Sequence, residues 1–327
     1  MKKTLSSVGL IALATTAFAE EKPVLTVYAP DYFTSEWGPG PKIEAAFEKT
    51  CGCDLQYVAG DVLPRLLLEG ERTKADVVIG LNTDVTKRAR ETGLFLPHGQ
   101  DTSDLTLPIE WTDDVFLPFN WGHTAFIYNT EKMSNAPTTF DAFLADEGTK
   151  VVLQDPRSSI SGLALMLWVK AVYGDDSQEA FNKLARKTLT VTKGWSESYG
   201  MFTDGEADMV LSYTTSPAYH IIAEGDETKR AAIFDEGHYF MTELAARVKT
   251  SEQPELAQAF MGFVLSETFQ EMIPTANWSF PAKLDADKLP EGFKKLDMPK
   301  KALFYSEDEA AGLRDAALEE WLSAFSQ

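Results

Sequence analysis

Short apolar stretches alternate with amphipathic ones along the part of the chain that follows residue 20. The segment 24–28 is apolar and β-branched, 54–59 has the pattern of a second strand, and 75–80 has the apolar composition of a buried strand. Between these segments, apolar residues such as Ile43 and Phe47 recur at helical spacing. This alternation of strands and helices predicts a parallel sheet with helices on both of its faces.

A second alternation of strands and helices occupies the middle of the chain. The segments 116–119 and 124–128 have the composition of strands that leave the first unit, and 240–248 that of a strand that returns to it. We therefore expect an α/β protein of two lobes, joined by a hinge of crossover strands, with the ligand cleft between them. Further strands are predicted over 151–154, 189–192 and 209–213, and helices over 162–172, 254–273 and 307–326.

The N-terminus has the pattern of an export signal. Lys2 and Lys3 precede an uncharged run over 5–17 that is too short to span a membrane, and Ala17-Phe18-Ala19 fits the small-x-small cleavage pattern. We expect a signal peptide at 1–19 and a mature protein that lies free in the periplasm. The expected lobes are 20–118 together with 240–327 for lobe 1, and 119–239 for lobe 2.

The chain is strongly acidic, with a formal charge of −20. This charge argues against nucleic acid and against anionic membrane surfaces as partners. It also favours a cationic ligand through the overall field, although solubility explains the same charge equally well. The four histidines show no metal-ligand spacing, and two thiols alone do not make a zinc site, so no metal is expected.

The chain has two cysteines, Cys51 and Cys53, which are separated by Gly52. An exported protein can form a disulfide, but a bridge over one intervening residue requires a bend in the backbone. Gly52 would ease that bend, and the sequence leaves open whether the bridge forms.

Two turns from a strand into a helix are rich in hydroxyl groups. The turn within 154–162 contains Ser159 and Ile160, and free N–H groups at such a helix start suit an anion such as phosphate. Serine N-capping explains the same residues without a ligand. The turn within 212–219 precedes Pro217, a favourable first helical residue, and contains Tyr213, Thr214, Thr215 and Ser216.

Aromatic residues accompany these turns. Trp195 follows Gly194 at the end of a strand, where it could fill the core or form an exposed platform, while Trp278 lies in a polar loop. Tyr219 lies just after the second hydroxyl-rich turn. Aromatic faces bind flat rings and cations, so the combination favours a flat, positively charged heterocycle with a polar tail.

At these residues the chain closely resembles the thiamine-binding periplasmic proteins of bacterial ABC importers. The likeness covers nearly the whole mature chain and consists of long blocks rather than short patterns. The most specific blocks are 22–28, 37–41, 190–199 (TVTKGWSESY), 211–220 (LSYTTSPAYH) and 274–278.

The resemblance implies a type II periplasmic binding-protein fold and no enzymatic activity, cofactor or metal. The implied ligands are thiamine, thiamine monophosphate and thiamine diphosphate, which a monomer would deliver to an inner-membrane ABC permease with its ATPase.

The resemblance also assigns roles by position. Trp195 would stack on a ring, and Ser159 and Ile160 would lie near the phosphate, although Ile160 replaces a hydroxyl residue and can offer only its backbone N–H. Gly60 and Asp61 match a family Asp-Gly contact. The remaining implied contacts are Tyr213, Thr214, Thr215, Ser216, Tyr219 and Trp278.

Three other functions compete with this interpretation. A binding protein for a polyamine or another small cation would also use an acidic, aromatic-walled pocket. A thiaminase-like transferase would require an activated cysteine in the cleft, whereas Cys51 and Cys53 precede the second strand and lie at the end of the sheet away from the site. A ferric-iron binder of the same superfamily typically uses adjacent tyrosines, and this sequence has no Tyr-Tyr pair.

Overall fold

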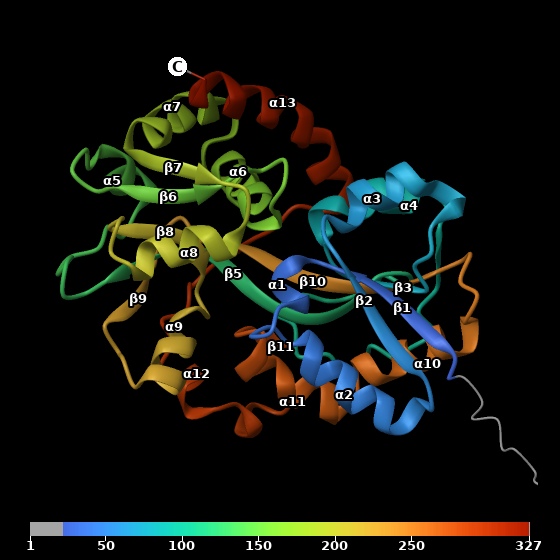
Figure 1. The fold of residues 1–327 in the computed structure, drawn as a ribbon. Coiled ribbons are helices and arrows are strands. Elements are labelled where there is room, and N and C mark those ends of the chain that lie inside the picture. Colours follow the sequence, from blue (N-terminus) through green and yellow to red (C-terminus); the bar gives the residue numbers. More distant parts are fainter. Residues whose placement is uncertain (1–21, 327) are drawn as a thin grey trace, which may run out of the picture.

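The computed structural model describes residues 22–326, so the predicted signal peptide at 1–19 lies outside the described residues. Two α/β units lie side by side, one formed mainly by the ends of the chain and the other by its middle (Figure 1). Among residues 22–326, no helix combines the length and the apolar composition that crossing a bilayer requires.

The first unit is a mixed sheet with helices on both faces. Its strands run in the order β2 (Asp54–Ala59), β1 (Val24–Ala29), β3 (Val77–Asn82), β10 (His238–Val248) and β5 (Leu117–Asn129). β1 pairs in parallel with β2 and β3, as the sequence pattern predicted, while β10 pairs antiparallel with β3 and β5. One face is covered by α2 (Gly40–Cys51), α10 (Pro254–Val264) and α11 (Glu267–Ala276), and the other by α3 (Val62–Glu69) and α4 (Thr86–Glu91).

The second unit continues from β5 through three further strands. Their order is β8 (Met209–Tyr213), β6 (Val151–Gln154) and β7 (Thr188–Thr192), and β9 (Lys229–Ala232) also pairs with β5. One face carries α5 (Phe140–Ala145), α6 (Ile160–Tyr173) and α7 (Ser177–Lys187), and the other carries α8 (Trp195–Thr203). The hydrophobic core of the larger face centres on rings such as Phe126 and Trp168, which are fully buried.

A single long strand joins the two units. The predicted strands over 116–119 and 124–128 form one continuous element, β5. Its residues up to His123 pair with β10, and its residues from Thr124 onward pair with β8 and β9. The predicted returning strand is β10, and the prediction of crossover strands between two units therefore matches the observed connectivity.

Two expectations about the C-terminal part of the chain were wrong. The helix predicted over 254–273 is two helices, α10 and α11, because the Ser266 side chain accepts a hydrogen bond from the Phe269 N–H and starts a new helix. The segment 240–327 does not belong wholly to lobe 1. Its last helix, α13 (Glu307–Phe325), packs Ala317 and Trp321 into the hydrophobic core of the second unit.

The N-terminal end of α13 remains attached to the first unit. Arg90 of α4 forms an ion pair with Glu307, and Lys87 forms one with Asp308. The helix, which is red in Figure 1, therefore contacts both units.

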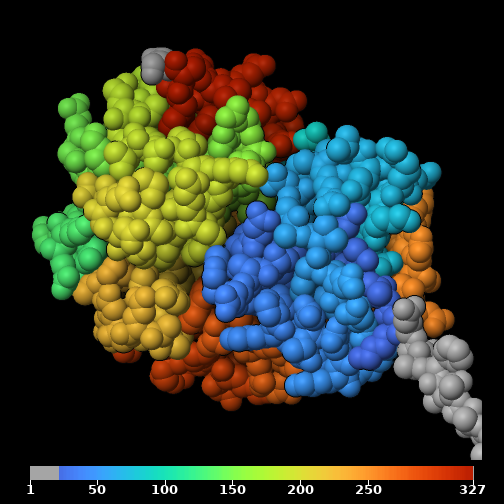
Figure 2. Space-filling view, in the orientation of Figure 1, coloured from blue at the N-terminus to red at the C-terminus, as the bar shows by residue number. Residues whose placement is uncertain are grey.

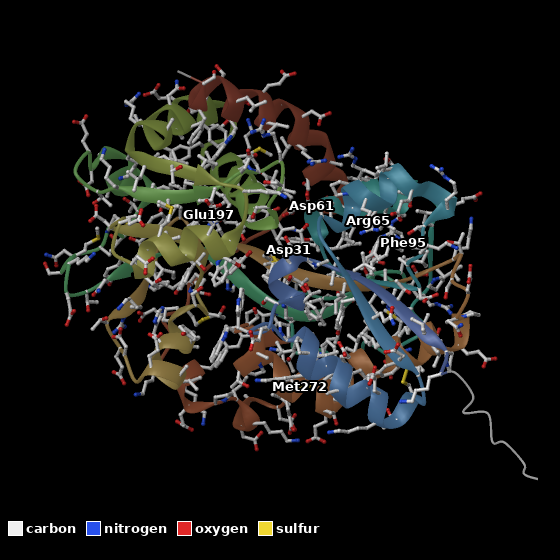
Figure 3. The ribbon with its side chains drawn as sticks, viewed as in Figure 1. Asp31, Asp61, Arg65, Phe95, Glu197 and Met272 are labelled. Carbon is white, nitrogen blue, oxygen red and sulfur yellow. A yellow bond between two sulfur atoms is a disulfide. The ribbon has the colours of Figure 1, made fainter. Side chains whose placement is uncertain are left out.

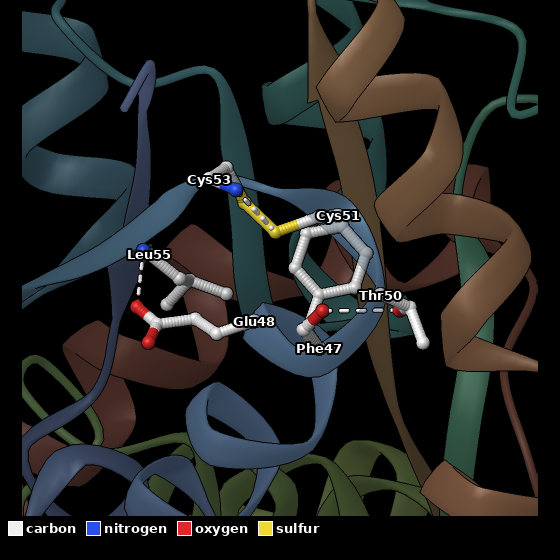
Figure 4. The surroundings of a disulfide bond; sticks show 6 residues. All are labelled: Phe47, Glu48, Thr50, Cys51, Cys53 and Leu55. Carbon is white, nitrogen blue, oxygen red and sulfur yellow. Dashed lines mark hydrogen bonds between the residues drawn. A yellow bond between two sulfur atoms is a disulfide. The ribbon is translucent and has the colours of Figure 1, made fainter. Parts of the chain in front are cut away.

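The disulfide that the sequence left open is formed. Cys51 ends α2, Gly52 adopts a left-handed conformation with φ of 65°, and Cys53 follows with its Cα 5.2 Å from that of Cys51 (Figure 4). Glycine tolerates this conformation at no steric cost, so the chain turns sharply from the helix into β2.

Short elements complete the described structure. They are α1 (Asp31–Thr34), α9 (Pro217–Tyr219), α12 (Glu291–Lys294), β4 (Phe95–Leu96), β11 (Phe280–Pro281), β12 (Ala302–Leu303), the 3₁₀ turns Gly70–Arg72, Thr83–Val85, Gly174–Asp176 and Ala286–Lys288, and a π-helical turn His220–Glu224.

Replacing Trp321 by alanine tests the packing of α13 on the second unit. The Trp321 ring is buried against Phe181 and stacks on Phe325, so Trp321→Ala should lower the free energy of unfolding by about 3–5 kcal/mol in a urea titration. The neighbouring Leu322 is 39% exposed, and Leu322→Ala should cost less than about 1 kcal/mol. Equal losses for the two variants would contradict the assigned packing.

Candidate functional site

The candidate site lies where the carboxyl ends of β1 and β3 face those of β6 and β8. Figure 2 shows the two units meeting along a narrow hollowed seam, with the blue N-terminal segments on one side and the yellow segments on the other. Aromatic rings meet across this seam, since Trp37 lies 6.4 Å from Trp195 and Tyr219 lies 5.2 Å from Trp278 between ring centroids. Open α/β sheets bind ligands at such strand ends.

Trp195 is fixed at the edge of the second unit. Its indole Nε1 donates a hydrogen bond of 2.8 Å to Ser212 Oγ, and its ring stacks on Tyr199 at 4.6 Å. The residue is only partly buried, and Trp37 beside it is 55% exposed. Trp195 is therefore an oriented ring at the seam and not a plug inside one core.

The turn after β8 holds four of the predicted residues together. Tyr213 Oη lies 2.6 Å from Ser161 Oγ, and Ser216 Oγ lies 2.7 Å from Ser212 Oγ. Thr214 and Thr215 are buried, and neither Oγ1 has a hydrogen-bond partner among the described residues. A buried hydroxyl without a partner costs about 1–3 kcal/mol, so these two oxygens favour a polar ligand.

The first hydroxyl-rich turn is largely used by the protein itself. Ser159 is the N-cap of α6 and accepts a long hydrogen bond of 3.5 Å from the Gly162 N–H, as the capping alternative predicted. Ser158 donates to the Lys193 carbonyl at 2.8 Å. Ile160 is the first residue of α6, so its backbone N–H has no acceptor within the helix and could donate to an anion.

The residues Gly60 and Asp61 lie at the rim of the first unit. Gly60 has φ of 138°, which only glycine adopts without strain. Asp61 precedes α3 in the N-cap position, but its side chain makes no capping hydrogen bond and is exposed. Figure 3 shows Asp61 and Asp31 at the edge of this unit that faces Glu197 of the second unit.

Trp278 has the most unusual backbone of the predicted residues. Among residues 22–326 it is the one residue other than glycine with a positive φ, at 55°. Such conformations are uncommon and tend to occur at ligand sites. The preceding residue, Asn277, accepts a hydrogen bond from the Asn120 amide, which ties this loop to β5.

The sequence analysis missed a buried carboxyl group at the base of the seam. Glu243 of β10 is 4% exposed and lies directly opposite Asn82 of β3 and Asn120 of β5. Its carboxyl oxygens accept hydrogen bonds from the Tyr32 hydroxyl and the Asn120 amide. Burial raises the pKa of Glu243 to about 8. The signal in the sequence was a single acid within the mostly apolar strand 240–248.

Asp84 is a second buried carboxyl group near the same place. It lies inside the 3₁₀ turn Thr83–Val85 and is 4% exposed. It accepts hydrogen bonds from the Tyr239 hydroxyl at 2.7 Å and the Asn82 amide at 3.2 Å. Burial raises its pKa to about 7, because the charged form loses hydration that these two bonds do not fully replace.

Strand register connects this buried acid to the hydroxyl-rich turn. Gly122 is two residues beyond Asn120 on β5, so it lies on the same face as Asn120 and Glu243. A Cβ atom on Gly122 would lie 3.7 Å from Thr215 Oγ1. The face shared by Glu243 and Asn120 therefore runs directly to Thr215.

Among the described residues, three side chains of types that can coordinate a metal ion lie close together. Ligand atoms of His220, Glu224 and Asp226 lie within 4.8 Å of one another. Each residue already has a partner, since His220 binds Tyr199 and Glu224 through its two ring nitrogens, while Asp226 pairs with Lys229. These contacts explain the cluster as part of the fold.

Two shallow depressions lie elsewhere on the surface. One is lined by residues that include Thr26, Asp76 and Ser251, and the other by residues that include Glu48 and Asp54. Both lie at the amino ends of the first strands, and neither contains a residue predicted from the sequence to bind ligand.

The model of the family described as bacterial extracellular solute-binding protein matches residues 13–271. The chain belongs to this family. This solute-binding protein is 47% identical over 322 residues to the thiamine-binding periplasmic protein of Escherichia coli (strain K12), covering 97% of this chain and 98% of that one. It is 44% identical over 329 residues to the protein of the same name from Brucella abortus, covering 99% and 98%.

A solved structure described as a periplasmic thiamin binding protein has the same arrangement of elements. It superposes with a TM-score of 0.91 at 47% identity, covering 98% of this chain and 100% of its own. These matches confirm the predicted binding-protein fold and the periplasmic location of this solute-binding protein. The roles given to individual site residues stay predictions.

The buried carboxyl group should make the stability of the ligand-free protein depend on pH. Because the pKa of Glu243 is raised to about 8 by folding, the folded state holds this proton more tightly than the unfolded chain. Its contribution to stability is complete below about pH 4.5, the unfolded value, and is lost as the pH rises to about 8.

We therefore expect Glu243→Gln, which resembles the protonated acid, to gain stability relative to wild type between pH 5 and pH 8. The gain should be at most about 1.4 kcal/mol per pH unit, measured by urea unfolding without ligand. The exposed Glu255→Gln provides the control for removing one charge. Parallel pH profiles for wild type and Glu243→Gln would contradict the assignment.

Proposed function

We propose that this solute-binding protein binds thiamine and its phosphate esters in the seam between its two units and delivers them to an inner-membrane ABC permease. The observation that carries the proposal is the pairing of an oriented ring, Trp195, with unpartnered buried hydroxyls at Thr214 and Thr215 above a buried acid, Glu243. The names of the relatives at 44–47% identity support the choice of ligand.

Thiamine combines a neutral aminopyrimidine with a positively charged thiazolium ring, and the seam offers groups suited to both. Stacking and cation–π contacts with rings such as Trp195, Tyr219 and Trp278 would contribute about 0.5–2 kcal/mol each beyond the area that they bury. The hydroxyls of Thr214 and Thr215 would donate or accept hydrogen bonds at the ring edges and the hydroxyethyl tail, and the Asn82 amide oxygen would accept them.

A phosphate on that tail would extend toward the start of α6. The N–H of Ile160 and the hydroxyls of the Ser161–Tyr213 pair lie there, and a helix N-terminus favours negative charge. Thiamine monophosphate and diphosphate are therefore included among the proposed ligands.

Ligand binding would change the position of the two units relative to each other. A ligand held by residues of both units favours the arrangement in which both contact it, and a permease that recognises this arrangement would receive loaded protein selectively. β5 is the element at which such a movement would occur, because its pairing passes from one sheet to the other between His123 and Thr124.

The thiaminase-like alternative requires a free thiol, and this chain does not offer one. Both cysteines, Cys51 and Cys53, are bonded to each other, and they precede β2 at the end of the sheet opposite to the seam. A polyamine would pair with the acidic groups and place ammonium groups over the rings, but it has no flat ring to stack on Trp195.

Replacing Trp195 tests the proposed stacking. Thiamine should bind purified wild-type protein, after unfolding and refolding to remove bound ligand, with a saturable heat signal at micromolar concentrations. Trp195→Ala should weaken binding about 10-fold or more, because the lost ring contact corresponds to roughly 1.4 kcal/mol, whereas Trp195→Phe should retain part of the affinity.

The control replaces Trp111, whose indole donates to the Phe116 carbonyl inside the first unit. Trp111→Phe should leave thiamine affinity within about twofold. Absence of thiamine binding by the wild type, or tighter binding of spermidine than of thiamine, would rule out the proposed ligand.

A further inference from the structure

The polar face of β10 carries a carboxyl group that the fold itself leaves without a counter-ion. Tyr239, Met241 and Glu243 alternate along this strand, so their side chains share one face, and Asn120 and Gly122 of β5 lie on it as well. His123 and Trp121 lie on the opposite face, where they pack against Phe240.

No lysine, arginine or histidine forms an ion pair with Glu243 within residues 22–326. The titratable groups on its side of the sheet include phenols, Asp84 and Arg247, whose guanidinium donates to the Pro97 carbonyl. Tyr32 contacts it from α1, while Tyr213, Tyr239 and Asp84 lie farther along the same face. A buried ionised carboxylate without a positive partner is costly, so Glu243 is poorly placed to carry its charge when the site holds no cation.

Asp84 differs from Glu243 in this respect. The positive charge of Arg314 on α13 favours the ionised form of Asp84 and so opposes the rise in its pKa. Asp84 lies at the contact between α13 and the first unit. The burial of Asp84 is therefore explained by its position in the link between the two units. Glu243 lies on the same face as Gly122, where an added Cβ atom would lie 3.7 Å from Thr215 Oγ1 of the ligand-facing turn.

We propose that Glu243 is the counter-charge for the cationic ring of the ligand, and that it changes from the neutral acid to the carboxylate when the ligand binds. The inference rests on the function proposed above and names the residue that recognises the positive charge. The step is balanced: the Glu243 O–H bond breaks, the proton passes to the solvent buffer, and the permanent charge of the thiazolium replaces it in the site. The raised pKa of Glu243 agrees with a neutral acid in the ligand-free protein at pH 7.

The count of protons released on binding tests this inference. Thiamine is titrated by calorimetry into ligand-free protein at pH 7 in two buffers that differ in ionisation enthalpy. We expect wild type to release roughly 0.5–1 proton per thiamine bound. Glu243→Gln should still bind thiamine, with lower affinity, and should release no proton. Release should fall toward zero above about pH 9, where Glu243 is already ionised.

A neutral isostere of thiamine separates the effect of the positive charge from that of the rest of the ligand. In 3-deazathiamine a neutral thiophene replaces the thiazolium, while the aminopyrimidine is unchanged. Its binding to wild type should release no proton. Glu243→Gln should weaken the binding of thiamine by a factor at least about 10 times larger than the factor by which it weakens the binding of 3-deazathiamine.

Two further variants assign the proton and control for structural damage. Asp84→Asn should keep the release of a proton, and the exposed Glu255→Gln should match wild type. Thermal unfolding of Glu243→Gln at pH 5 should match wild type, which shows that the variant folds. Release that persists in Glu243→Gln, or disappears in Asp84→Asn alone, would overturn the inference. Failure of wild type to bind thiamine at all would instead contradict the proposed function.

Discussion

The structure depends on one strand that belongs to two sheets. β5 donates and accepts backbone hydrogen bonds with β10 over its first half and with β8 and β9 over its second half. The two units therefore cannot separate without breaking this ladder, although they can bend about the point where its pairing changes. The same strand sets the spacing of the site, since Asn120 opposite Glu243 and Thr124 opposite Tyr213 are four residues, or about 13 Å, apart.

The polar groups within that span are unusual for a protein interior. Thr214, Thr215 and Asn82 each have a buried oxygen without a partner among the described residues, and Glu243 is buried without a cation. Each such group reduces the stability of the ligand-free protein, by about 1–3 kcal/mol for a neutral oxygen. Proteins tolerate this cost mainly at functional sites, where a ligand supplies the missing partners. The α13 helix offsets part of it by packing Trp321 into one unit and pairing Glu307 with the other.

The sequence predicted most of the fold because the determining signals are local. The strands 54–59, 151–154 and 209–213 coincide with β2, β6 and β8, since each is a short strand-forming segment between turn residues. The destination of α13 is a long-range property, because its acidic, Ala-rich sequence does not specify which core it covers. Glu243 escaped prediction for a similar reason: only strand register places it opposite Asn82 and Asn120.

A crystal structure of the thiamine complex, with the thiazolium sulfur located by its anomalous scattering, tests the central claim most directly. The account predicts that this sulfur lies in the seam, with the positive ring beside Glu243 and the pyrimidine among the rings of both units. Sulfur density at the depression lined by Thr26 and Ser251, or on the outer surface of a single unit, would contradict it.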